Sequence, residues 1–273
     1  IPFVNLRMNY RNHRKIMVVD AKVAYLGGFN IGDEYLGKGE LGEWRDTHMK
    51  IEGNAVLTLQ SRFFMDWNAV AKEKNRKDYA EAYFPIADKK GNTAMQIVTS
   101  GPDDEDQTIK MGFLKMISQA KESIYIQTPY FIPDESLHEM LKIAVLSGVK
   151  VKIMIPSKPD HPFVYRATEY FAKDIVEYGA EVYMYQNGFL HSKVMVVDDE
   201  IVSVGTANMD VRSFKLNFEI NAFIYDRDVA EELIANFDED QKNCIRATHD
   251  YFAKQSKWRK FKQAFSRLLS PIL

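Results

Sequence analysis

The chain has 273 residues, of which 46% are hydrophobic and 27% charged, as in a globular protein and unlike a disordered or fibrous chain. Its single cysteine, Cys244, excludes an internal disulfide, and no run of 18 apolar residues occurs that could form a transmembrane helix. The net charge of −2 conceals a segment, 251–273, with six basic and no acidic residues. An acidic body with a basic tail argues against a nucleic-acid-binding protein and indicates that the C-terminal segment binds to a surface.

The first predicted element is a hairpin that follows a histidine. The apolar run at 16–19 predicts a buried strand, and 22–28 predicts its antiparallel partner. Because side chains alternate along a strand, His13 and Lys15 share one face, whereas Asp20 has the opposite parity. We therefore expect the aspartate of this motif, Asp20, to brace the backbone at the end of the strand, with direct participation in catalysis as the alternative. The glycines at 27–28 are expected to permit a tight turn that presents Asn30.

The middle of the chain alternates between strands and helices. Strands are predicted at 123–128, 150–155 and 181–185, and helices at 134–146 and 164–178, with Pro133 before the first helix and Gly148 and Gly179 after the two helices. A later strand at 218–225 precedes a helix predicted at 229–245. This order predicts an α/β protein, with a mixed β-sheet flanked by helices on both faces.

A second copy of the hairpin pattern lies near the end of this region. Both copies read H-x-K-x4-D-x6-G-x-x-N, and every matched pair is 178 residues apart. Five matched positions in register exclude coincidence. The second copy supplies His191, Lys193, Asp198, Gly205 and Asn208.

The repeat divides the chain unequally. About 95 residues of strand and helix lead up to His191, whereas 12 residues precede His13. We predict two half-domains related by a pseudo-twofold axis: 1–95, an incomplete first half, and 96–273, a second half ending in a basic amphipathic tail at about 251–273. The sequence, which also begins without methionine, is expected to be the C-terminal part of a longer chain whose other part completes the first half.

The paired residues suit chemistry at a phosphodiester. A histidine can act as a nucleophile or as a general acid and base, a lysine offers positive charge to a phosphate, and an asparagine adds neutral donors. Two such sets facing each other allow one imidazole to attack phosphorus while the other protonates the leaving alcohol. No zinc or magnesium motif accompanies the histidines, so we expect no metal and no cofactor.

This duplicated motif resembles that of the phospholipase D superfamily, and the resemblance covers nearly the whole chain. Longer strings are more narrowly similar to the bacterial cardiolipin synthases: 27–36 (GGFNIGDEYL), 44–48 (WRDTH), 128–133 (TPYFIP), 158–161 (KPDH) and 265–273 (FSRLLSPIL). The resemblance implies a phospholipase D-like fold and transfer of a phosphatidyl group between two phosphatidylglycerol molecules, releasing glycerol. It also implies a phosphohistidine intermediate on His13, with His191 as acid and then base, and a location at the bacterial cytoplasmic membrane.

The resemblance further implies an acid that orients each imidazole. The matching positions are Asp46 and Glu219, which lie 33 and 28 residues after the histidines of their own halves. We therefore expect Asp46 to serve His13 and Glu219 to serve His191. The family's membrane segments and upstream half-domain have no counterpart in this sequence.

Several alternatives stay open from the sequence. A phospholipid hydrolase, another phosphatidyltransferase or a nuclease would carry the same motifs, and an inactive lipid-binding fragment is the non-enzyme alternative. His161 and Tyr130 follow predicted strands and are candidates for pocket residues, against helix capping and core packing. The apolar spacing of Trp258, Phe261 and Phe265 predicts either an interfacial helix or a helix packed on the core.

Overall fold

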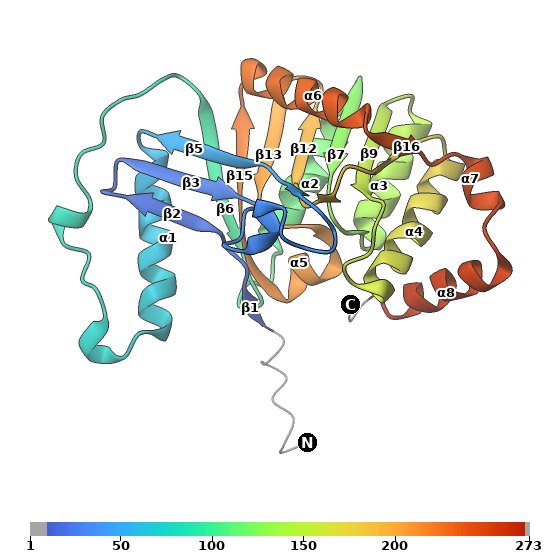
Figure 1. The fold of residues 1–273 in the computed structure, drawn as a ribbon. Helices are drawn as coiled ribbons and strands as arrows, with labels where there is room; N and C mark the ends of the chain where they lie inside the picture. Colours follow the sequence, from blue (N-terminus) through green and yellow to red (C-terminus); the bar gives the residue numbers. More distant parts are fainter. Residues whose placement is uncertain (1–9, 271–273) are drawn as a thin grey trace.

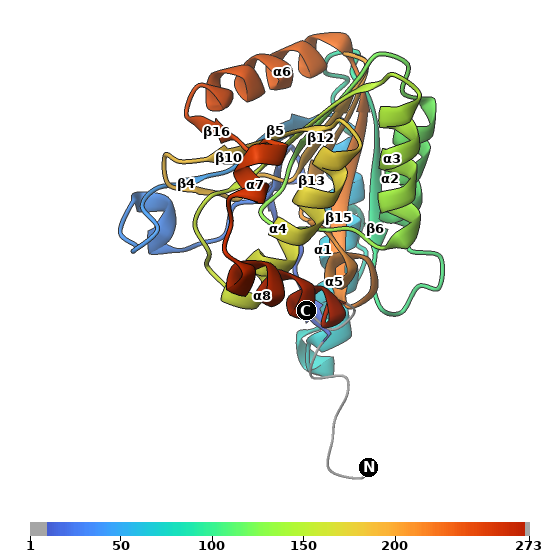
Figure 2. The same ribbon diagram turned by 90° about the vertical axis from the view of Figure 1, so that its right-hand side faces the viewer.

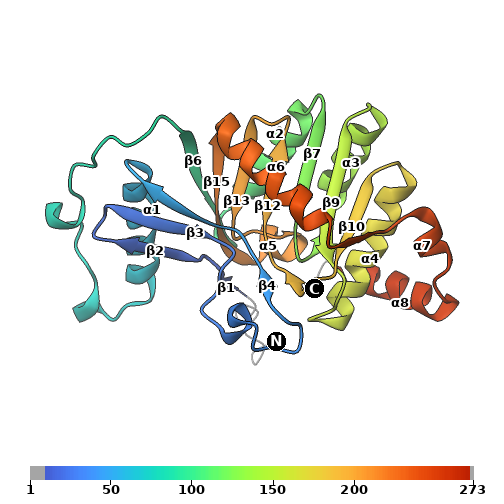
Figure 3. The ribbon, with the colours of Figure 1, turned by 45° about the horizontal axis from the view of Figure 1, so that its top comes forward.

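A computed structural model describes residues 10–270 of the chain; the first nine residues of the predicted first half and the last three of the tail lie outside this range. Within it, a large mixed sheet stands at the centre and a small antiparallel sheet leans across one end (Figures 1 and 3). The large sheet has the strand order β1-β15-β13-β12-β7-β9-β10-β16, with β6 also paired to β15. Its strands are β1 (Arg11–Asn12), β6 (Ala94–Ser100), β7 (Ser123–Gln127), β9 (Lys150–Pro156), β10 (Glu181–Tyr185), β12 (Val194–Val197), β13 (Ile201–Gly205), β15 (Asn217–Tyr225) and β16 (Cys244–Arg246).

The helices cover both faces of this sheet, as the alternating pattern predicts. The helices of this region are α2 (Thr108–Gln119), α3 (Glu135–Leu146), α4 (Pro162–Glu177), α5 (Val211–Lys215), α6 (Arg227–Gln241), α7 (His249–Ala253) and α8 (Lys257–Leu268), of which α7 and α8 pack on α4. Figure 2 shows α2 and α3 on the side of the sheet away from α6. The helix predicted at 229–245 is too long, because β16 leaves it and pairs antiparallel with β10. Asp134 caps α3 by accepting a hydrogen bond from the Leu137 N–H, which explains where that helix begins.

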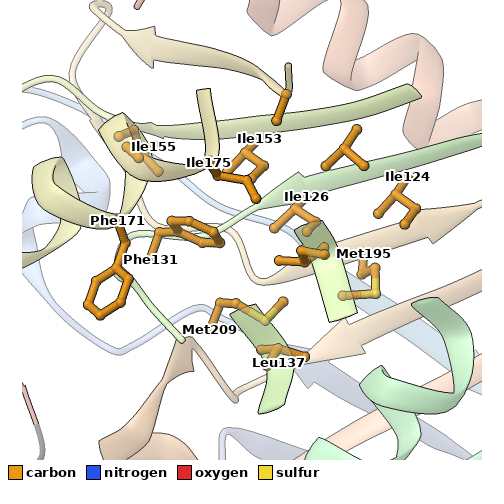
Figure 4. Close-up of a cluster of buried hydrophobic side chains, with 14 of the residues drawn as sticks. Ile124, Ile126, Phe131, Leu137, Ile153, Ile155, Phe171, Ile175, Met195 and Met209 are labelled. Carbon is orange, nitrogen blue, oxygen red and sulfur yellow. The ribbon is translucent and has the colours of Figure 1, made fainter. Parts of the chain in front are cut away.

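Side chains alternate along β12, so its two faces join two different hydrophobic clusters. On β12, Met195 and Val197 face α2, α3 and α4, where they join the cluster shown in Figure 4. Val194 and Val196 face the other way, toward the small sheet, and pack in a second cluster with Leu26 of that sheet. The second cluster therefore joins the two predicted halves through apolar contact.

The small sheet has the order β2-β3-β5, covered by helix α1. Its elements are β2 (Ile16–Val19), β3 (Val23–Gly27), β5 (His48–Glu52) and α1 (Ala55–Val70). The sequence predicted β2 and β3 but not α1. Both repeat hairpins turn on two residues of positive φ, Asp20-Ala21 and Asp198-Asp199, which begin three-residue loops between the paired strands.

The repeat copies differ in their surroundings. The matched strands β2 and β12 occupy the same positions under the 178-residue offset. In the part of the chain that the structure describes, β12 pairs with β13 and β7, whereas β2 pairs with β3 alone. Met195 on β12 is consequently 1% exposed, while its counterpart Met17 is 54% exposed. Beyond α1, the chain runs to β6 with two short 3-10 turns, Glu73–Asn75 and Glu81–Tyr83. Among residues 10–270, no helix is long and apolar enough to cross a membrane.

Candidate active site

Two short parallel strand pairs place the histidines at the junction of the halves. The strand β1 pairs with the start of β15, and β11 (Phe189–Leu190) pairs with β4 (Trp44–Arg45). The His13 N–H donates to the Phe218 carbonyl at 2.9 Å, and the His191 N–H donates to the Arg45 carbonyl at 2.7 Å. Each histidine is thus bound through its backbone to a strand of the other half.

This arrangement pairs each imidazole with the acid of the opposite half. His13 Nδ1 lies 2.9 Å from both carboxylate oxygens of Glu219, and His191 Nδ1 lies 2.7 Å from Asp46 Oδ2. The expectation that each acid serves the histidine of its own half is therefore wrong. The physical reason is the strand pairing, since each acid comes directly after the residue that binds the other half's histidine backbone. Both halves are needed to orient either ring.

The two lysines lie inside the site, and neither forms a direct ion pair with a carboxylate of residues 10–270. Lys15 Nζ donates to the His13 carbonyl at 2.8 Å, and Lys193 Nζ donates to the His191 carbonyl. Burial lowers the pKa of Lys15 to about 8 and that of Lys193 to about 7, against the opposing charges of the two acids. An anion bound between them would favour their charged forms, which is the property required of a phosphate site.

His191 is enclosed by aromatic side chains. The Trp44 ring lies 4.8 Å from the imidazole, and the Tyr35 hydroxyl lies 2.9 Å from both His191 Nδ1 and Asp46 Oδ2. Burial, together with the charge of Lys193, lowers the pKa of His191 to about 3, so the ring is neutral in the free protein. Burial favours the neutral form of Asp46, but Lys193 and His191 outweigh it and lower the pKa of this carboxyl.

His13 is the more accessible of the two histidines. Its side chain is 28% exposed, compared with 7% for His191. It lines a pocket of about 320 Å³ together with Tyr130, His161 and Asn208. The structure thus places Tyr130 and His161 beside the first motif; the His161 side chain does not cap α4.

The repeat aspartates differ in their contacts. Asp198 accepts hydrogen bonds from three successive backbone N–H groups, those of Lys121, Glu122 and Ser123, at 2.7–2.9 Å. It therefore braces the start of β7, as expected of a residue at a strand end. Asp20 is exposed on its turn and makes no hydrogen bond to a residue of the described range.

The glycine that the two motifs share, Gly27 in the first and Gly205 in the second, has a different role from the one expected. Neither has positive φ, so turn geometry does not require them. A Cβ atom on Gly27 would lie 2.3 Å from the Thr47 carbonyl oxygen, and one on Gly205 would lie 2.3 Å from an Asn221 side-chain oxygen. On the next residue, Gly28, a Cβ atom would lie 2.1 Å from Asp46 Oδ1. These glycines allow polar atoms of neighbouring segments to approach the backbone closely.

The asparagines lie beyond these glycines. Asn208 Nδ2 is 3.3 Å from Asp210 Oδ2, and its Oδ1 is buried without a partner in the described residues. Asn30 is half-buried on the loop after β3. Two site residues were not predicted from the sequence: Tyr35, and Thr206, whose hydroxyl donates to Glu219 at 2.5 Å. Tyr35 belongs to the string 27–36 that carried the family resemblance, which was the available signal.

Comparisons with known proteins identify the relatives of this chain. The family described as "Cardiolipin synthase, PLD-like domain" matches residues 113–241. The chain is 57% identical over 274 residues to a cardiolipin synthase of Listeria welshimeri, covering all of this chain and 57% of that protein. It is 56% identical over 274 residues to one of Staphylococcus aureus (strain Mu50), covering 55% of that protein. The chain therefore spans little more than half the length of these curated relatives.

Solved structures show the same fold at low identity. A phosphatidylserine synthase of Haemophilus influenzae Rd KW20 superposes with a TM-score of 0.72 at 16% identity, covering 98% of this chain and 73% of that one. Nuc of Salmonella typhimurium, a phospholipase D family member, gives a TM-score of 0.50 at 21% identity, covering 57% of this chain and 99% of that one. The fold and the duplicated site define a member of the phospholipase D superfamily. Within that superfamily, the chain belongs with the bacterial cardiolipin synthases.

Proposed function

We propose that this chain carries the catalytic centre of a cardiolipin synthase that acts at the bacterial cytoplasmic membrane. The reaction transfers a phosphatidyl group from one phosphatidylglycerol to the terminal hydroxyl of a second, giving cardiolipin and glycerol. The observation that carries the proposal is the crossed pairing of His13 with Glu219 and of His191 with Asp46. Each carboxylate occupies Nδ1, so Nε2 of each ring is left for the substrate.

In the first step, His13 Nε2 attacks phosphorus and the bond from phosphorus to the glycerol oxygen breaks. His191 donates its Nε2 proton to that oxygen, and glycerol leaves. In the second step, His191 takes the proton of the incoming hydroxyl, whose oxygen attacks phosphorus as the bond to His13 breaks. Lys15 and Lys193 stabilise charge on the non-bridging oxygens. The negative phosphodiester counteracts the low pKa of His191 and allows it to hold the proton that the first step requires.

The assignment of His13 as the nucleophile rests on the family resemblance and on access. A nucleophile must reach a phosphorus atom that carries bulky acyl groups. Of the two motif histidines, His13 is the more exposed, and it lines a pocket. The enclosed His191, held by Asp46 and Tyr35, suits a proton carrier whose orientation stays fixed through both steps.

Product analysis tests the proposed reaction. The natural full-length protein would be incubated with vesicles containing glycerol-labelled and phosphate-labelled phosphatidylglycerol. Cardiolipin and free glycerol in equal amounts are expected, and both disappear in His13→Ala and His191→Ala variants. Phosphatidic acid with glycerol would establish the hydrolase alternative instead. Lipid binding without any product would establish the lipid-binding alternative.

We also propose that a further segment of the natural protein completes the first half at the free edge of β2. In the second half, the equivalent edge of β12 is covered by β7, whose first residues donate to Asp198. Met17 is exposed, and Asp20 has no hydrogen-bond partner among the described residues; their counterparts in the other copy, Met195 and Asp198, are in contact with β7 and the residues before it. The curated relatives have the additional length that such a segment requires.

Amide hydrogen exchange tests this second proposal. The backbone N–H groups of β2 that point away from β3 are expected to exchange slowly in the natural full-length protein and quickly in the 273-residue chain. The matched strand β12 should exchange slowly in both. Equal, fast exchange of β2 in the two proteins would contradict the proposal.

A further inference from the structure

The helix α8 is packed with its polar side chains inward and its aromatic side chains outward. Gln263 and Ser266 are 2% and 1% exposed. A helix docked on an apolar core shows the reverse pattern. The outward residues follow helical spacing along one face, and they are Trp258 (63% exposed), Phe261 (58%), Phe265 (47%) and Leu268 (73%).

A buried carboxylate on α4 fixes this orientation. Glu169 is 1% exposed and accepts from Arg259 Nε at 3.1 Å and from Gln263 Nε2 at 3.3 Å, both on α8. Arg166, on α4 itself, completes the shell of the carboxylate at 2.5 Å. Turning the apolar face of α8 inward would leave Glu169 buried with fewer partners, which is strongly unfavourable. The exposure of the aromatic face is therefore a property of the fold.

The outward face forms a continuous apolar ridge bordered by positive charge. Trp258 stacks on Phe261 with ring centroids 5.4 Å apart, and Phe261 stacks on Phe265 at 6.5 Å. Lys262 lies over the Trp258 ring at 5.3 Å. With no acidic residue from position 251 to the end of the sequence, the charge around the ridge complements an anionic surface.

The end of this helix adjoins the candidate active site. Ser270, two residues beyond α8, lines the same pocket as His13, and Leu268 lies in the wall of a neighbouring pocket that also contains Ser270. Figure 2 shows α8 beneath α4, on the side of the molecule where α5 and the start of β15 also lie. A surface that receives the apolar ridge would therefore lie close to the mouth of the His13 pocket.

We propose that α8 is an interfacial helix that docks this protein on an anionic phospholipid bilayer. Its aromatic and leucine side chains enter the boundary between headgroups and acyl chains, while its lysines and arginines contact anionic headgroups. The helix thereby holds the His13 pocket at the depth of the phosphodiesters. The inference rests on the proposed function for its purpose, but the binding itself requires no turnover.

Vesicle flotation of the 273-residue chain tests the docking without any reaction. Vesicles of phosphatidylcholine with one third phosphatidylglycerol, or with one third phosphatidylserine, are both expected to carry the protein, and pure phosphatidylcholine to carry much less. The Phe261→Ser/Phe265→Ser variant is expected to bind at least roughly tenfold more weakly, because two half-exposed aromatic side chains no longer enter the bilayer. The matched control is Ile143→Ser/Leu146→Ser, which removes two exposed apolar side chains from α3 and should bind as the unaltered chain does.

Two further measurements separate the possible results. Trp258 fluorescence should become protected from an aqueous quencher on vesicles, a change absent from Trp258→Phe; continued access to the quencher would overturn the proposal. Binding to phosphatidylglycerol alone, lost in His13→Ala, would show capture by the catalytic site rather than docking by α8. Lipid-free self-association abolished by the Phe261→Ser/Phe265→Ser change would assign the ridge to a second copy and overturn the proposal. Failure of catalysis with docking intact would count against the proposed function alone.

Discussion

The replacement Asp46→Asn tests whether Asp46 sets the tautomer of the His191 imidazole. Asp46 accepts from the Thr47 N–H at 2.8 Å and from the Tyr35 hydroxyl at 2.9 Å, and it faces His191 Nδ1 at 2.7 Å. Asparagine has the same shape and can keep the bond from Thr47 through its oxygen, which turns its amide group toward His191. The amide donates, so Nδ1 must become an acceptor and the proton moves to Nε2.

That tautomer cannot take a proton from the incoming hydroxyl in the second step. Loss of an orienting carboxylate beside a catalytic histidine lowers turnover by up to about 10⁴-fold, or about 5.5 kcal/mol in the activation barrier. We expect a decrease of about 10³- to 10⁴-fold in cardiolipin formation by Asp46→Asn. The rate would be measured with labelled phosphatidylglycerol vesicles, with thermal unfolding as the check on folding. Asp33→Asn, a change at an exposed aspartate, is the matched control and should stay within about twofold.

Nitrogen NMR of the two imidazoles distinguishes crossed from uncrossed pairing. Asp46→Asn should change the tautomer of His191 and leave the ring of His13 as it was, and Glu219→Gln should do the opposite. Resonances would be assigned from the His13→Ala and His191→Ala variants. A changed His13 ring with an unchanged His191 ring in Asp46→Asn would refute the crossed arrangement.

Three further predictions follow from individual contacts. Gly28→Ala should displace the Asp46 carboxylate, because the added Cβ would lie 2.1 Å from it. The activity should fall at least roughly tenfold. The free energy of unfolding, measured in urea, should fall by about 1–3 kcal/mol. Because the folded state holds the pKa of His191 at about 3, below the unfolded value near ~6.5, the free energy of unfolding should fall as the pH drops from about 6.5 toward 3. The free energy of unfolding should be about 2 kcal/mol lower at pH 5 than at pH 7. Its dependence on pH should be weaker in His191→Gln. Asp198→Ala should lower the free energy of unfolding by about 2–4 kcal/mol, because three hydrogen bonds to backbone N–H groups are lost. Asp20→Ala in this chain should lower it by less than about 1 kcal/mol. Equal decreases in the two variants would contradict the different roles of these aspartates.

Much of the fold could be predicted because local patterns and tertiary structure agree. The apolar runs at 16–19 and 194–197 form strands whose limits coincide under the 178-residue offset, since β-branched residues flanked by turn residues have few alternatives. The helix α6 was predicted too long, because Cys244 and Ile245 are apolar enough to continue its pattern. Their pairing with β10 is a contact between distant segments that periodicity does not encode.

The site was predictable in its members but not in its connections. The repeat identified both histidines and both lysines, and the resemblance identified Asp46 and Glu219. Which acid meets which histidine depends on two parallel strand pairings of two residues each, and such short pairings leave no pattern in a sequence. Tyr35 was missed for a similar reason, since it has no matching tyrosine in the second copy and reaches His191 only through the tertiary fold.

The central claim is that phosphatidyl transfer proceeds through a covalent bond to His13 in a site shared by both halves. The most direct test quenches the natural full-length protein during turnover of a phosphatidylglycerol analogue with a good leaving group and maps the modified peptide by mass spectrometry. We predict label on His13 in the unaltered protein, accumulation of that label in His191→Ala, where its breakdown is blocked, and none in His13→Ala. Label on His191 in the His13→Ala variant, with none on His13 in the converse variant, would contradict the assignment.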